Sequence, residues 1–242
     1  MDKSKLEPKI ILAIETSSKL CSIALWDKNN KNNKIIGHVD HIGAKVHNQH
    51  LLPSIKHLLE KNDLSLTDLD GIAIGVGPGS FTGLRIGCAA VQGLALSLEI
   101  PIFTCSSLRI MSQDFILKNI NNIKNKICVI LDANAGDYYI GEYIIKNNIA
   151  ENINPDFLLN KQDLVSYFKN NNFDYYIGDI CLDNLNLDLD LNLSLNNTLS
   201  SIPSPIPSSI ALCELFSDIL KNPIGPEDLE PVYLRTQKHW EK

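Results

Sequence analysis

The sequence lacks the patterns that mark zinc knuckles and proteins that hold nucleic acid by themselves. Its six cysteines form no Cys-x-x-Cys pair, so we predict no zinc knuckle. Lysine and arginine number 22 against 28 acidic residues, the net charge is −6, and no basic run stands out. Proteins that neutralise many phosphates usually show a basic face. If this chain serves an RNA, we therefore expect another subunit to hold most of it.

Long apolar segments are also missing. The apolar run at residues 10–14 stops at Glu15, which makes it too short for a signal-peptide core or a membrane span. No other stretch approaches about 18 uninterrupted apolar residues. Four cysteines lie in apolar runs and are predicted to be small core residues, and the pattern favours a reducing compartment over secretion. We therefore expect a soluble, cytoplasmic protein that does not bind a membrane.

What is present is an ordinary globular composition with a strand and helix pattern. The 242 residues, 44% hydrophobic and 21% charged, suffice for one large domain or two small ones. Apolar runs between turn residues predict strands at residues 10–14, 21–26, 34–40, 71–76, 100–104, 126–131, 138–145 and 175–178. Helical periodicity predicts helices at residues 47–62, 82–97, 106–118, 161–170 and 210–220. Residues 182–200 alternate leucine with asparagine and aspartate, which leaves a strand and a loose insertion both open.

The order of these elements predicts two similar units. The chain opens with two antiparallel hairpins, and the alternation of strands and helices after them favours parallel pairing. Each unit starts with strands and then a helix. This order predicts an α/β protein with the duplicated, actin-like ATPase fold of actin, Hsp70 and sugar kinases, in two β-β-β-α-β-α lobes. We expect an N-terminal lobe at 1–105 with the helix at 207–221 packing back on it, a C-terminal lobe at 106–206 and a tail at 222–242.

A glycine-rich turn, Gly77-Pro-Gly-Ser80, lies between a predicted strand and a predicted helix. Such a turn can cradle phosphate with backbone N–H groups. It fails the known templates, because a G-x-G-x-x-G motif from Gly75 requires glycine where Ser80 stands and no Gly-Lys-Ser/Thr follows. The helix start, capped by Ser80 or Thr82, either holds an anion with help from Arg85 or is a tight turn with an N-cap. We favour the second interpretation.

The residues of an active centre are not evident. Residues 15–17, Glu-Thr-Ser, follow the first strand, where kinases of the actin-like class present Asp-x-Gly to magnesium and phosphate. His47 and His50 are a weak metal pair, because no H-E-x-x-H motif and no third ligand in a helical frame accompany them. No G-x-S-x-G motif occurs, and no Ser/His/Asp triad can be placed. We therefore assign no catalytic, cofactor-binding or metal-binding residue.

Small residues recur along the predicted helix at 82–97. Glycine inside a helix costs about 1 kcal/mol relative to alanine, so Gly83 and Gly87, with Ala90, need a reason. The usual reason is the close approach of another backbone, either within this fold or on another protein, and both remain open. The helix predicted at 47–62 carries histidine and serine on the face opposite its leucines, where a solvent-exposed helix usually carries many charged residues. We interpret the two helices as a candidate docking surface.

Several stretches together resemble the TsaB (YeaZ) family. The most specific is Gly75-Val-Gly-Pro-Gly-Ser-Phe-Thr-Gly-Leu-Arg-Ile-Gly87, which continues to Gln92-Gly-Leu-Ala95. Matching motifs also lie at residues 11–17, 21–26, 47–53, 127–139 and 230–235. The likeness is dense over residues 9–145 and returns at 226–235.

The resemblance implies an actin-like duplicated fold and a non-catalytic scaffold subunit without a cofactor. It implies a heterodimer with TsaD, the catalytic subunit, and a wider complex with the ATPase TsaE. Together they transfer threonylcarbamoyl from its AMP ester to the tRNA adenosine beside the anticodon. It also implies a homodimer when TsaD is absent, and contact with tRNA only through the complex. In this family the two N-terminal helices form the contact, which implies an interface at His47, His50, Ser54, His57, Gly79, Ser80, Thr82, Gly83, Arg85, Gly87 and Ala90.

The metal ligands of TsaD have no counterpart in this sequence. TsaD carries His-x-x-x-His after an Ile-Pro strand to hold its metal, and those places fall here on Ser107 and Met111, which bind hard cations poorly. Two other functions stay open. One is an actin-like-fold nucleotide-dependent phosphotransferase, disfavoured by the missing Asp-x-Gly, and the other is a peptidase that processes TsaD, for which no nucleophile–base set is found. Under the scaffold hypothesis, we expect Gly87→Arg or Ala90→Glu to leave the fold intact and to abolish TsaD binding.

Overall fold

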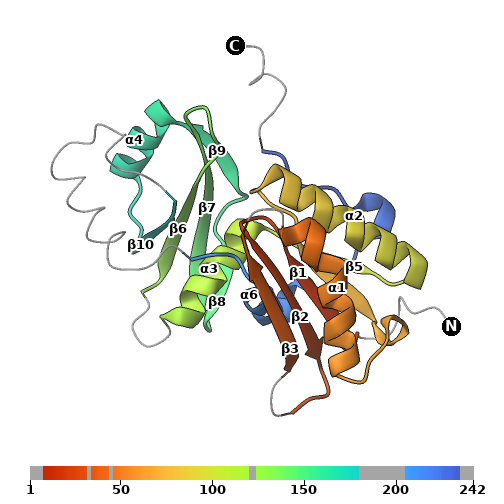
Figure 1. Cartoon of the computed structure of the whole chain (residues 1–242). Helices are drawn as coiled ribbons and strands as arrows, with labels where there is room; N and C mark the ends of the chain where they lie inside the picture. Colours follow the sequence, from red (N-terminus) through yellow and green to blue (C-terminus); the bar gives the residue numbers. More distant parts are fainter. Residues whose placement is uncertain (1–7, 32–33, 44–45, 120–123, 180–204, 235–242) are drawn as a thin grey trace. The chain divides into compact units, whose positions relative to one another are not determined.

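The structure is a computed structural model, shown in Figure 1, that describes residues 8–31, 34–43, 46–119, 124–179 and 205–234. The chain divides into two compact units. Unit 1 comprises residues 1–110 and 206–232, and unit 2 comprises residues 111–205 and 233–242. The stretch at 182–200, for which the sequence left a strand and an insertion open, lies outside the described residues. Each unit is built on its own mixed sheet.

The sheet of unit 1 has five strands in the order β3-β2-β1-β4-β5. They are β1 (Ile10–Glu15), β2 (Leu20–Asp27), β3 (Ile35–Ile42), β4 (Gly71–Gly75) and β5 (Ile102–Cys105). β2 pairs antiparallel with β1 and with β3, whereas β4 pairs parallel with β1 and with β5. The predicted antiparallel hairpins and the parallel continuation are confirmed. β3 runs two residues beyond its predicted end, because Ile42 still pairs with Leu20 on β2.

Two long helices, α1 (Val46–Lys61) and α2 (Phe81–Leu98), cover one face of this sheet and contact each other (Figure 1). In both helices, apolar side chains at spacings of three and four point into one shared core with alternate residues of β2. The core residues of α1 are Val46, Leu51, Ile55, Leu58 and Leu59. Those of α2 are Cys88, Val91 and Ala95.

The chain returns to the opposite face of the same sheet as α6 (Ser209–Glu214) and α7 (Phe216–Ile219). Successive side chains of a strand point to opposite faces, so Ser22 and Trp26 of β2 point away from the core beneath α1. The Ser209 N–H donates to the Ser22 hydroxyl at 2.9 Å. The Phe216 ring meets the Trp26 ring edge to face, with centroids 5.3 Å apart. Unit 1 is therefore a sheet between two helical layers.

Unit 2 has a sheet in the order β10-β6-β7-β8, and β9 also pairs with β7. Its elements after α3 (Ser107–Lys118), which contains the unit boundary, are β6 (Lys126–Asp132), β7 (Asp137–Lys146), β8 (Ile149–Asn152), β9 (Phe157–Asn160), α4 (Lys161–Asn170) and β10 (Tyr175–Gly178). β6 and β7 form an antiparallel hairpin, and β10 lies parallel to β6. Aromatic side chains of β9, α4 and β10 pack against one another on this sheet.

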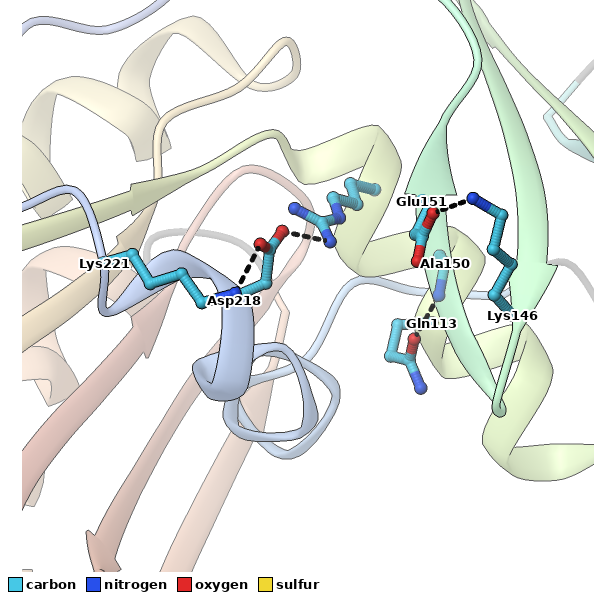
Figure 2. A network of polar contacts seen from close by, with 7 residues as sticks. Gln113, Lys146, Ala150, Glu151, Asp218 and Lys221 are labelled. Carbon is cyan, nitrogen blue, oxygen red and sulfur yellow. Dashed lines mark hydrogen bonds and ion pairs between the residues drawn. The ribbon is translucent and has the colours of Figure 1, made fainter.

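A side chain of α3 covers the outer edge of β8. The Gln113 amide donates to the Asn148 carbonyl oxygen at 2.9 Å and accepts from the Ala150 N–H at 2.9 Å, as a neighbouring strand would. Figure 2 shows Gln113 reaching Ala150, and Lys146 of β7 paired with Glu151 of β8. This edge is therefore partly satisfied within unit 2.

Three features differ from the sequence prediction. The sequence pattern does not predict β8 and β9, which have four residues each. β8 forms because Asn147 and Asn148 take positive φ values of 50° and 63° and turn the chain back along β7. The single helix predicted at 210–220 is two short helices, because the helix is interrupted at Leu215, which ends α6 and begins α7.

The element order confirms the predicted α/β class and the actin-like fold. In each unit an antiparallel start is followed by a helix and then by a parallel strand. Among the described residues, α2 is the one helix that is long and apolar enough to span a membrane by length and composition alone. Core helices meet the same criterion, and one side of α2 lies in the core of unit 1.

Candidate functional site

The carboxyl group at the end of β1 is sealed inside unit 1. Glu15 has no exposed surface, and its two oxygens accept hydrogen bonds from the Ser17 N–H at 2.6 Å and from the Ser107 hydroxyl at 3.3 Å. A Cβ atom at Gly75 on β4 would lie 1.8 Å from the Glu15 carboxylate, so the glycine leaves room for the carboxyl group in this position. Burial raises the pKa of Glu15, and the hydrogen bonds from Ser17 and Ser107 oppose that rise.

The glycine-rich turn closes on the chain itself. The Gly77 N–H donates to the Ser107 hydroxyl at 3.1 Å, and the Ser80 N–H donates to the Ser17 carbonyl oxygen at 2.6 Å. A Cβ atom at Gly79 would lie 2.3 Å from the same carbonyl oxygen. A phosphate cradle needs such N–H groups to face its ligand, but here they bond within unit 1. The geometry therefore favours the tight turn with an N-cap over an anion site.

The glycines in the first half of α2 allow close packing inside unit 1. A Cβ atom at Gly83 would lie 2.1 Å from the Thr16 carbonyl oxygen, and one at Gly87 would lie 2.3 Å from the Thr16 hydroxyl oxygen. The close neighbour that the sequence left unassigned is therefore this chain's own β1 end. The expectation that Gly87→Arg leaves the fold intact is wrong, because this buried position has no space for the side chain.

The histidine face of α1 is divided between the interior and the surface. His47 is buried, with Nε2 3.2 Å from a carbonyl oxygen of β2. Ser54 is also buried, with its hydroxyl 2.9 Å from Nε2 of His41 on β3. The His50 ring stacks on the His41 ring, whereas His57 is exposed. In the part of the chain that the structure describes, no group of three or more histidine, cysteine, aspartate or glutamate residues is placed to hold a metal ion.

The outer sides of α1 and α2 carry apolar and small side chains among polar and charged ones. We define the helix surface by nine of the exposed residues of the two helices, which are Leu52, Pro53, His57, Phe81, Thr82, Arg85, Ala89, Gly93 and Leu96; Lys56, Glu60 and Lys61 of α1 are also exposed. Leu96 is 71% exposed, and a Cβ atom at Gly93 would have no neighbour within 4 Å. The Arg85 guanidinium lies 3.7 Å over the Phe81 ring, and it is the single charged group in the sequence of α2.

The structure places the predicted interface residues on both sides of the helices. Those buried inside unit 1 are His47, Ser54, Gly83 and Gly87. Those partly exposed are His50, Gly79 and Ala90. Those exposed are His57, Ser80, Thr82 and Arg85. Exposed apolar residues that sequence reasoning did not assign to an interface are Leu52, Phe81 and Leu96. The helical period predicts an outward position for Leu96 alone, because Leu52 and Phe81 lie seven residues before the core residues Leu59 and Cys88 and so share their side of the helix by period.

Comparison with known sequences identifies related proteins. A family model described as TsaD, tRNA N6-adenosine threonylcarbamoyltransferase, matches residues 20–174. The chain is 39% identical over 133 residues to the tRNA threonylcarbamoyladenosine biosynthesis protein TsaB of Escherichia coli K12, covering 55% of this chain and 54% of that protein. It is 36% identical over 146 residues to the Bacillus subtilis protein of the same name, covering 60% of each. The matches thus span less than two thirds of these curated relatives.

Comparison with solved structures supports the fold. YeaZ from Pseudomonas aeruginosa superposes with a TM-score of 0.70 at 23% identity, covering 93% of this chain and all of that one. A second Pseudomonas aeruginosa structure, described as uncharacterized and similar to peptidase YeaZ, gives a TM-score of 0.73 at 24% identity, covering 94% and 100%. The fold, the matched segments and the family model agree. The chain belongs to the TsaB (YeaZ) family, within the larger family that the TsaD model describes.

Proposed function

We propose that this chain is the non-catalytic scaffold subunit of a complex that transfers threonylcarbamoyl to tRNA adenosine beside the anticodon. A TsaD-type chain supplies the catalysis, and TsaE supplies the ATPase. The observation that carries the proposal is the closed turn. The strand, turn and helix of a phosphate site are present. However, Glu15, Ser17 and Ser107 form hydrogen bonds with the turn and with one another, and Glu15 and Ser17 fill the space beside its glycines. The names of the curated relatives supply the pathway, tRNA threonylcarbamoyladenosine biosynthesis.

The positions that correspond to the TsaD metal ligands support a non-catalytic role. The Ser107 hydroxyl is buried and already bonded to the Gly77 N–H and the Glu15 carboxyl group. Met111 is buried and offers a thioether, which is a soft ligand that suits copper(I) better than a hard catalytic cation. Neither residue fits the metal of a transferase.

The helix surface is the proposed contact with the partner. Its large exposed side chains, Leu52, Phe81 and Leu96, are between 55% and 71% exposed, and a partner that covered them would remove their apolar area from water. Small residues at Ala89 and Gly93 let another helix approach closely. The family model named for TsaD matches this chain, so a TsaD-type partner shares the fold and presents a related pair of helices. The same surface pairs two copies of this chain when the partner is absent.

The charge of the chain supports contact with tRNA only through the complex. The net charge is −6, and α2 has a single cation. A chain that bound tRNA by itself would need several lysine or arginine side chains on one face to neutralise phosphates. We place the complex in the cytoplasm.

The test is binding to TsaD from the same organism, measured by isothermal calorimetry and size-exclusion chromatography. Leu96→Glu and Ala89→Glu put a carboxylate into the proposed contact, and we expect each to weaken binding by about 100-fold or more. Ile153→Glu is the matched control, because Ile153 is an apolar residue of unit 2 with 41% exposure. Unimpaired binding by both helix variants, with normal circular dichroism, would refute the proposed contact.

A second test addresses the role rather than the contact. Threonylcarbamoyladenosine formed on tRNA is measured by mass spectrometry with the three proteins together and with each left out in turn. We expect no product without this chain and none from this chain alone. Product formed at the full rate without this chain would contradict the scaffold role.

The alternative, a nucleotide-dependent phosphotransferase, is disfavoured by the same closed turn. Glu15 accepts a hydrogen bond from the Ser17 N–H, and the Ser80 N–H of the glycine-rich turn donates to the Ser17 carbonyl oxygen. These groups therefore bond within the chain instead of facing a nucleotide. Calorimetry of the isolated chain with Mg-ATP distinguishes the two, because micromolar binding with turnover would favour the phosphotransferase.

A further inference from the structure

The C-terminal end of unit 1 is attached to α2. It contains one turn of 3₁₀ helix, η4 (Pro226–Asp228), which contacts α2 and is drawn in blue beside it in Figure 1. The Gln92 side-chain amide of α2 donates to the Pro226 carbonyl oxygen at 3.2 Å and to the Leu229 carbonyl oxygen at 2.8 Å. One side chain of α2 thus holds η4 at its first residue and at the residue that ends it.

Three further contacts fix this segment within unit 1. Before η4, the Ile224 N–H donates to the Ile102 carbonyl oxygen of β5 at 2.8 Å. After η4, Leu229 is 2% exposed and belongs to the core that α2 shares with the sheet. The Val232 N–H then donates to the Val76 carbonyl oxygen at 2.8 Å. The exposed side chains of η4 therefore project from a backbone that is held on both sides.

This segment lies at the edge of the helix surface. Ala89 and Leu96 stand three residues before and four residues after Gln92, so the three residues share one side of α2. Ala89 and Leu96 belong to the helix surface, and Leu96 is 71% exposed. Gln92 itself is only partly exposed, because η4 lies against it. A partner that covers Ala89 and Leu96 therefore lies next to η4.

The exposed charged side chains of this segment are all acidic. Residues 222–234 contain Glu227, Asp228 and Glu230 and no lysine or arginine. All three acidic residues are exposed, and none of them forms an ion pair with a described residue. The single charged group of α2 is Arg85, which lies about two turns before Gln92. We call Glu227, Asp228 and Glu230 the acidic edge.

The acidic edge favours a partner of opposite charge. Opposite charges at the edge of an interface speed the encounter of two proteins, whereas like charges slow it and disfavour the complex. In the proposed complex this chain contacts tRNA only through its partners, so a partner must hold the phosphates, which requires lysine and arginine side chains. A partner with a basic surface complements the acidic edge.

We propose that η4 and the acidic edge form the rim of the partner contact, and that they select a TsaD-type partner with lysine or arginine side chains beside the helix that covers α2. The apolar residues of the helix surface form the buried part of the contact. The carboxylates of the edge guide the approach of the partner and fix its orientation. This inference rests on the proposed function, and it adds the charge of the partner's surface.

The experiment measures the rate constants of association and dissociation with TsaD from the same organism, by surface plasmon resonance at about 20 mM and about 500 mM salt. Glu227→Lys/Asp228→Lys reverses two charges of the acidic edge. We expect its association rate constant to fall about 10-fold or more at the lower salt concentration, and less than about 3-fold at the higher one, because salt screens the charges. Its dissociation rate constant should change much less.

Two controls separate the acidic edge from net charge and from the shape of η4. Glu227→Asp/Asp228→Glu keeps both charges and should associate like the unmodified chain. Glu214→Lys changes the net charge as much as Asp228→Lys does, but Glu214 is exposed at the end of α6, on the opposite face of the sheet. At the lower salt concentration, Asp228→Lys should slow association by about 3-fold or more, and Glu214→Lys by less than about 1.5-fold.

An association rate of Glu227→Lys/Asp228→Lys equal to that of the unmodified chain at the lower salt concentration would overturn the inference. Faster association would also overturn it, because the partner surface would then be acidic. Equal slowing by Asp228→Lys and Glu214→Lys would show an effect of net charge alone and would overturn it too. The proposed function fails separately, because Leu96→Glu and Ala89→Glu leave the acidic edge unchanged. Unimpaired binding by these two variants contradicts the helix contact, whatever the edge variants do.

Discussion

Replacing Gly83 with alanine tests the close approach of α2 to the end of β1. The new Cβ atom would lie 2.1 Å from the Thr16 carbonyl oxygen, a backbone atom that cannot rotate away. Overpacking of this kind costs about 1–3 kcal/mol, and alanine returns up to about 1 kcal/mol of helix propensity. We therefore expect a net loss of about 1–2 kcal/mol in the free energy of unfolding.

Gly93→Ala is the matched control on the same helix. A Cβ atom at Gly93 meets nothing within 4 Å, so the propensity gain stands alone and the variant should be more stable by about 0.5–1 kcal/mol. The two alanine variants thus change stability in opposite directions, although both replace a glycine of α2.

Urea unfolding followed by fluorescence measures the difference. Trp26 is buried against Phe216 in unit 1 and reports on that unit, in a background that carries Trp240→Phe. A lower midpoint at unchanged slope shows a loss of stability rather than a change in the unfolding transition. Equal midpoints for Gly83→Ala and Gly93→Ala would refute the close packing of α2 on Thr16.

The remaining predictions concern the polar groups beside the closed turn. Burial raises the pKa of Glu15, so the folded state keeps its proton at pH values where the unfolded state has lost it. This contribution to stability is full below the unfolded pKa and is lost as pH rises through the folded pKa. As pH rises from about 4, the unmodified chain should lose stability that Glu15→Gln keeps, so the melting temperature of the variant should rise relative to that of the unmodified chain. A difference in melting temperature that stays constant with pH would contradict the raised pKa. The Thr16 hydroxyl is buried without a hydrogen-bond partner among the described residues, so Thr16→Val should raise the free energy of unfolding by about 1 kcal/mol in the same urea assay. A loss of stability would show that this hydroxyl has a partner in solution.

Most elements of the fold were predictable because their signals are local. The apolar run at residues 10–14 and the helical period over residues 47–62 are visible in a few turns of sequence, and the structure has β1 and α1 there. β8 was missed because four residues carry too little alternation, although Asn147 and Asn148 were a turn signal of the kind that makes tight hairpins. The break at Leu215 has no sequence signal that we recognise.

The candidate site was less predictable because its contacts join distant parts of the chain. The sequence showed that Gly75 and Glu15 end two strands, but their contact follows from the parallel pairing of β1 with β4. It showed histidines at 41 and 50, but only the placement of α1 on β3 brings their rings into a stack. It also did not show that Leu52 and Phe81 are exposed.

The sequence by itself determined the order of strands and helices, the absence of a phosphate template and the family, because each depends on residue types at short spacings. Only the tertiary structure decided that Gly83 and Gly87 face Thr16 of the same chain, and that Leu52 and Phe81 are exposed. The physical reason is that a glycine permits close approach without specifying what approaches. The neighbour is chosen by the pairing of strands that lie far apart in the sequence.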